Sequence, residues 1–78
     1  MNKKIVISGV LGFIGMKVAK EYSDLGYHVI GIDTVDILAN LPTPVHCNVY
    51  LDQLMFGDDE LAERIAQTTN SELIHCRL

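Results

Sequence analysis

The sequence has no tryptophan, only two cysteines, and fewer basic than acidic residues. Six lysines and arginines against ten acidic residues give a net charge of −4, which argues against nucleic acid or an anionic membrane as a partner. The cysteines, Cys47 and Cys76, form no C-x-x-C pair and have no metal-ligand spacing with a histidine. We therefore expect reduced thiols in a cytoplasmic protein, with no metal site.

The composition is that of a folded domain. Hydrophobic residues make up 49% of the 78 residues and charged residues 21%, which is typical of globular proteins. A chain of this length forms one small domain, or part of a larger one, of marginal stability. Two lysines before an apolar stretch also suggest a signal peptide. Glycines within that stretch, lysines directly after it and the lack of a cleavage motif argue against export.

Three glycines, Gly9, Gly12 and Gly15, lie between an apolar run at 5–7 and a helical pattern over 16–25. Glycine can adopt a positive φ, and it has no side chain to keep an anion away from backbone N–H groups. The following helix directs its unpaired N–H groups and its positive dipole end to the same place. The G-x-x-G-x-x-G spacing therefore predicts the pyrophosphate site of a dinucleotide-binding βαβ unit, although a tight turn without a ligand is the alternative.

Asp33 is the second feature that favours a nucleotide. It follows another apolar run, at 28–32, and lies roughly 20 residues beyond the glycines. An acid at this position can accept hydrogen bonds from the adenosine ribose hydroxyls, whereas a cap after the strand is the simpler role. Because a carboxylate repels a 2′-phosphate and no arginine is nearby, the sequence predicts NAD rather than NADP.

The rest of the chain alternates strand and helix signals. The first helix should bury Ile14, Val18, Tyr22 and Leu25, which share one face. A second helix should begin after Asp58, a good N-cap, and end near 70. Strands are expected at 4–8, 28–32, 45–51 and 73–76, with Met55 and Phe56 packing in the core or a loop.

These elements predict an α/β fold with a Rossmann-like, three-layer parallel sheet. Right-handed crossovers and a switch point beside the glycines give about four strands in the order 3-2-1-4, a partial Rossmann domain over residues 1–78. Cys47 and Cys76 would then lie near opposite edges of the sheet, too far apart for a disulfide.

The motif and the segment that ends at Asp33 together resemble the opening of the extended short-chain dehydrogenases/reductases, the NAD-dependent sugar-nucleotide epimerases and dehydratases. The form T/S-G-x-x-G-F-I-G is rather specific to that group, and the chain would cover the first third of a member. The resemblance implies that Asp33 holds the ribose. It also implies that the adenine contact after strand three falls on Asn48 and Val49. The implied cofactor-loop residues are Gly9, Leu11, Gly12, Phe13, Ile14 and Gly15.

The family oxidises a sugar transiently with bound NAD, using a Tyr-x-x-x-Lys pair. No tyrosine here fits, because the residues four positions on are Gly26, Gly31 and Leu54. The sugar-nucleotide domain is also missing from this sequence. We therefore expect this chain to supply the cofactor cradle and not the catalytic groups.

A second hypothesis is a non-enzymatic remnant that keeps the fold without binding a cofactor. Leu11 is larger than the family's usual loop residue, and Arg77 and Leu78 are bulky where the family has small residues. An exposed edge of the fourth strand would then favour a homo-oligomer by pairing with a second copy. His75, near the end of that strand, is expected to be structural.

Overall fold

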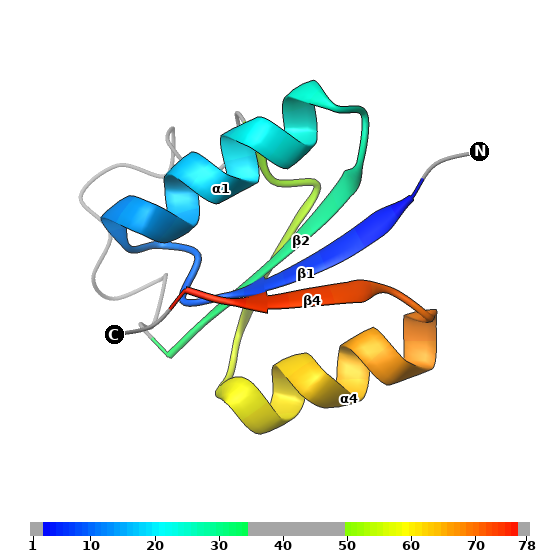
Figure 1. Cartoon of the computed structure of the whole chain (residues 1–78). Helices are drawn as coiled ribbons and strands as arrows, with labels where there is room; N and C mark the ends of the chain where they lie inside the picture. Colours follow the sequence, from blue (N-terminus) through cyan, green and yellow to red (C-terminus); the bar gives the residue numbers. More distant parts are fainter. Residues whose placement is uncertain (1–2, 35–49, 77–78) are drawn as a thin grey trace.

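The computed structural model describes residues 3–34 and 50–76. In chain order the elements are β1 (Lys4–Ser8), α1 (Phe13–Asp24), β2 (His28–Asp33), β3 (Gln53–Phe56), α4 (Asp59–Thr69) and β4 (Glu72–His75). The strands are all parallel and lie in the order β3-β2-β1-β4. Figure 1 shows α1 on one face of this sheet and α4 on the other. The predicted three-layer α/β fold and its strand order are therefore confirmed.

The central strand β1 is buried on both faces, as its uninterrupted apolar run predicts. Ile5 and Ile7 belong to the core beneath α1, together with Ala19, whereas Val6 belongs to the core beneath α4, together with Ala62. The three β1 side chains have no exposed surface. Burying each such side chain stabilises the fold by about 1.5–3 kcal/mol, so β1 holds the two layers together.

Helix α1 packs through two small residues as well as through the predicted Val18 and Tyr22, which are partly buried against the same core. Gly15 and Ala19 are buried, whereas Ile14 and Leu25 are 51% and 71% exposed. The expectation that these two residues lie in the buried face is therefore wrong. At 3.6 residues per turn they lie roughly 100–120° around the helix from the centre of the face formed by Gly15 and Ala19, and so outside that face. The helix ends as predicted, with Gly26 at a φ of 91°.

The predicted position of strand three is also wrong. The strand is Gln53–Phe56, which pairs with β2, whereas residues 45–49 lie outside the described residues and Tyr50 and Leu51 precede the strand. Met55 and Phe56 belong to this edge strand and are 38% and 60% exposed, so they are not core residues. A half-exposed edge strand has no clear alternation of apolar residues, which explains the error.

The second helix matches its prediction. Asp58 is the N-cap of α4, and Asn70 ends the helix in the left-handed conformation, with a φ of 54°. Strand β4 begins and ends one residue earlier than expected. Within residues 3–34 and 50–76, no helix has the length and hydropathy needed to cross a membrane.

Candidate functional site

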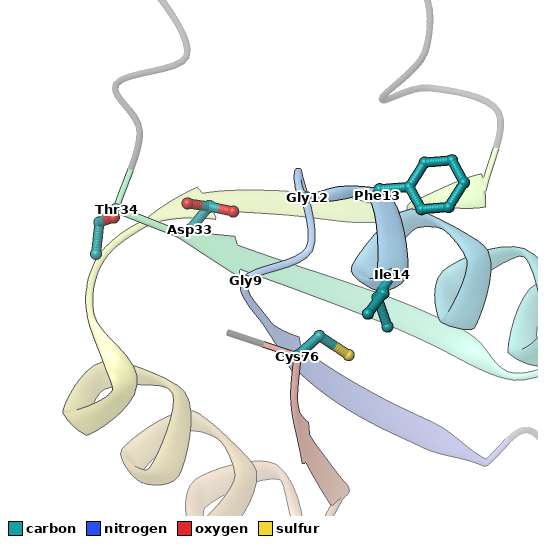
Figure 2. A pocket seen from close by; sticks show the side chains of 7 residues that line it. All are labelled: Gly9, Gly12, Phe13, Ile14, Asp33, Thr34 and Cys76. Atoms are coloured by element: carbon teal, nitrogen blue, oxygen red, sulfur yellow. The ribbon is translucent and has the colours of Figure 1, made fainter. Parts of the chain in front are cut away.

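A hollow of about 450 Å³ lies at the carboxyl ends of the central strands (Figure 2). Ligand pockets in proteins commonly have volumes of about 300–1,000 Å³. The lining residues come from the loop after β1, the first turn of α1, the end of β2 and the end of β4: Gly9, Gly12, Phe13, Ile14, Asp33, Thr34 and Cys76. Because α1 and α4 cover opposite faces, this is the switch point at which ligands bind to parallel α/β sheets.

The loop after β1 is held against the end of β2. The N–H groups of Gly9 and Val10 both point to the carbonyl oxygen of Ile32, at 2.8 and 3.3 Å, and Gly12 donates to the Gly9 carbonyl at 3.2 Å. Gly9 has a φ of 74°, which residues with a side chain rarely adopt. The first glycine of the motif is therefore required by the backbone of the turn.

Gly15 is required by close packing. A Cβ atom at this position would lie 2.3 Å from the Gly9 carbonyl oxygen and 2.7 Å from the Val10 Cα atom. The partner in this close contact is the backbone just past β1. Gly15 does not line the hollow, so its part in the site is to let α1 start directly behind the loop.

The N-terminus of α1 faces the hollow without a cap. Gly12 occupies the N-cap position, no side chain caps the helix, and its first turn contains no acidic residue. The N–H groups of Phe13, Ile14 and Gly15 have no acceptor within the helix, because intrahelical bonding starts with Met16. Ile14 points toward Cys76 in Figure 2, so the hollow combines polar backbone with apolar side chains.

Asp33 lies at the other side of the hollow, only 8% exposed. Its Oδ2 atom accepts a hydrogen bond from the N–H group of Leu11 at 3.0 Å. The Leu11 side chain packs against the core beneath α1 and does not line the hollow. The structure therefore brings the predicted acid and the predicted glycine loop together, and Leu11 takes part through its backbone.

Cys76 completes the lining from β4. Its N–H group donates to the Ser8 carbonyl at 2.8 Å, which continues the sheet by one residue. Burial raises the pKa of the Cys76 thiol above its usual value, so the thiol remains protonated at neutral pH. This side chain is therefore an apolar part of the wall.

Asn48 and Val49, the predicted adenine contacts, lie outside the described residues. Since β3 ends at Phe56, the residues that follow the third strand are Gly57 and Asp58. They line a second hollow of about 400 Å³, together with Thr34, Phe56 and Leu61. Thr34 lines both hollows. This second hollow was not predicted, because Asp58 was interpreted from the sequence only as the N-cap of the second helix.

A polar cluster on the α4 side of the sheet was not predicted. The fully buried Ser8 hydroxyl donates to the Asp59 carboxylate. His75 places Nδ1 at 3.5 Å from Asp59 Oδ1 and Nε2 at 3.9 Å from Glu63 Oε1. Among the described residues, no group of three His, Cys, Asp or Glu side chains is placed to hold a metal ion. The cluster joins the ends of β1 and β4 to α4, over a sequence separation that no local pattern reveals.

Comparison with known proteins assigns no family to the chain. No protein-family model matches the sequence, and no curated protein matches it. The functional argument therefore depends on the geometry of the hollow.

Proposed function

We propose that the chain binds a dinucleotide, NAD in preference to NADP, in the hollow at the carboxyl ends of β1 and β2. One observation carries the proposal: an uncapped helix N-terminus, a glycine loop and a nearly buried acid meet at one cavity. Each feature has a simpler explanation by itself. Their meeting at the switch point of a parallel sheet is what a dinucleotide needs.

In this proposal the pyrophosphate lies against the first turn of α1. The N–H groups of Phe13 and Ile14 donate to phosphate oxygens, and the positive end of the helix dipole attracts the charge. A negative group at such a position is stabilised by about 0.3–1 kcal/mol at an exposed site, and by up to about 2 kcal/mol when partly buried. Gly12 has no side chain, which leaves the approach to these amides open.

Asp33 and the second hollow then bind the adenosine. The Asp33 carboxylate accepts hydrogen bonds from ribose hydroxyls, and its charge disfavours a 2′-phosphate. No arginine or lysine lines the hollow within the described residues, so nothing there would neutralise that phosphate. Phe56 and Leu61 offer apolar surface to the adenine in the adjoining hollow.

The proposed role is that of a cofactor cradle, as in the N-terminal part of a NAD-dependent epimerase or dehydratase. The chemistry that NAD supplies is hydride transfer. The residues of this chain bind and orient the NAD. No catalytic role is proposed for them, because the sequence contains no Tyr-x-x-x-Lys pair. The remnant hypothesis predicts the same fold with an empty hollow, so binding is the property that distinguishes the two.

Calorimetric titration with NAD⁺ and with NADP⁺ tests the proposal. We expect NAD⁺ to bind more tightly, and Asp33→Asn to reduce the difference between the two ligands because it removes the charge. Asp24→Asn is the matched control, since Asp24 is an exposed carboxylate that pairs with Lys20. A folded chain that binds neither ligand at millimolar concentration would support the remnant hypothesis instead.

A further inference from the structure

The four N–H groups of the loop between β1 and α1, those of residues 9–12, all donate hydrogen bonds to acceptors within the chain. Gly9 and Val10 donate to the end of β2, and Gly12 donates back to Gly9. Leu11 differs from these three, because its acceptor is the Asp33 side chain. Within the described residues, it is the one N–H of this loop that is held by a carboxylate.

The hydrogen bond between the Leu11 N–H group and the Asp33 carboxylate is nearly buried, so it is strong and its loss would destabilise the loop. Asp33 is 8% exposed, and a carboxylate so far removed from water needs hydrogen-bond donors. A bond from an N–H group to an ionised oxygen is roughly twice as strong as a neutral one. Leu11 is enclosed between Val10, which is fully buried, and Gly12, the N-cap of α1. A displaced Leu11 would therefore displace the start of the helix.

We propose that Asp33 is a positioning residue for the glycine loop, in addition to any contact with the ribose. Its carboxylate fixes Leu11, and through Leu11 it sets the direction of the amides at the start of α1. An asparagine at position 33 retains a side-chain oxygen that can accept the same bond, whereas an alanine does not. The consequence for ligand binding rests on the proposed function; the consequence for the loop does not.

A ligand without ribose separates the two roles of Asp33. The probe is inorganic pyrophosphate, titrated by calorimetry into the wild-type chain, Asp33→Asn, Asp33→Ala and the control Asp24→Ala. We expect Asp33→Ala to weaken pyrophosphate binding about tenfold, and Asp33→Asn to bind at least as tightly as the wild type. Loss of a negative charge by itself would strengthen the binding of an anion. Unchanged or tighter binding by Asp33→Ala would therefore overturn the proposal.

The unliganded chain gives an independent test. In ¹H–¹⁵N spectra we expect the Leu11 amide to exchange with solvent at least about tenfold faster in Asp33→Ala than in the wild type, with Asp33→Asn close to the wild type. The amides of β1 report whether each variant remains folded. Equal Leu11 protection in Asp33→Ala would refute the positioning role. If the wild type binds neither pyrophosphate nor NAD⁺, the proposed function fails, and the Leu11 amide still decides the role of Asp33.

Discussion

The two helices of this protein begin in opposite ways. In α4, the Asp58 side chain accepts the N–H of Leu61 at 3.0 Å, and Asp59 and Glu60 occupy the first turn. In α1, the N-cap is Gly12, no side chain caps the helix, and the first turn has no acid. Both helices have a positive dipole end at the carboxyl edge of the sheet. The chain neutralises one of these ends itself and leaves the other directed at a hollow.

The lack of a capping side chain at α1 lowers the stability of the protein, and this loss suggests that the uncapped end has a function. A good N-cap is worth about 1 kcal/mol, and an acid in the first turn about 0.3–1 kcal/mol more. A domain of this size has a total stability of only several kcal/mol, so α1 forgoes a noticeable part of it. Close packing of Gly15 and Ala19 offsets the loss in part. Local rules of stability are most often broken in this way at functional sites.

The largest effect is expected from Gly15→Ala, which breaks the close contact behind the α1 N-terminus. The added methyl would overlap the backbone of Gly9 and Val10, which cannot move as a flexible side chain can. We expect a loss of about 2–4 kcal/mol in the free energy of unfolding, measured with urea. The control is Gly12→Ala, whose added methyl meets nothing closer than 3.4 Å and whose φ of −75° suits any residue. Equal effects of the two substitutions would contradict the packing argument.

Gly12→Asp gives α1 the kind of N-terminus that α4 has. The extended backbone at this position accepts an aspartate. We expect a gain of about 0.5–1 kcal/mol in stability, which is several degrees in melting temperature. We also expect NAD⁺ to bind at least about 30-fold more weakly, because a carboxylate would occupy the place of the phosphate. Gly12→Asn can cap the helix without adding a charge, so its NAD⁺ affinity should lie between that of the wild type and that of Gly12→Asp. Undiminished binding by Gly12→Asp would place the ligand elsewhere.

Removal of the α4 cap should have a smaller effect on stability than Gly15→Ala, and a smaller effect on binding than Gly12→Asp. Asp58→Ala leaves the Leu61 N–H without its side-chain acceptor, and we expect a loss of about 1 kcal/mol in thermal or urea unfolding. Asp58→Ser keeps a capping oxygen and should retain most of the stability. Asp58 lines only the adjoining hollow proposed for the adenine, so NAD⁺ affinity should fall less in both variants than in Gly12→Asp. A loss as large as that of Gly12→Asp would contradict the proposed difference between the two helix N-termini.

The smallest effect concerns Cys76, on the wall of the hollow. Burial raises its pKa above 9.0, so its contribution to stability is present below pH 9 and is lost as the pH rises through the raised value. In a Cys47→Ser background, stability should therefore fall more steeply above pH 9 with Cys76 than with Cys76→Ala. Alkylation of the same thiol at pH 8 should be slower with NAD⁺ present. An alkylation rate that is the same with and without NAD⁺ would argue against a ligand in this hollow.

Sequence reasoning succeeded where the signals are local. The bounds of β1, the start of α1 and the Asp58 cap follow from an apolar run, a glycine spacing and a capping residue within a few positions. Strand β3 was misplaced because its half-exposed residues at the sheet edge show no pattern, while residues 45–49 alternate more clearly. Pairing with β2 determines where this strand lies, and a local window of sequence does not contain the partner strand.

The arrangement of residues around the hollow was predicted only in part. The glycine spacing and Asp33 indicated a nucleotide site, and the structure brings them to one hollow. The bond from Leu11 to Asp33 and the bond from Ser8 to Asp59 were not predictable, because each joins residues that meet only after the sheet has formed. Spacing along the chain can suggest which residue types a site uses, but the hydrogen-bond partners depend on the fold.

An NMR titration with NAD⁺ tests the difference between the two helix N-termini most directly. The amides of Phe13, Ile14 and Gly15 should shift progressively and saturate, and they should shift by more than those of the first turn of α4, from Glu60 to Ala62, which lie beside the hollow proposed for the adenine. This result would show that the uncapped helix end receives the anion. Shifts at the start of α4 without shifts at the start of α1 would contradict the proposal, and so would a spectrum that does not change at millimolar NAD⁺.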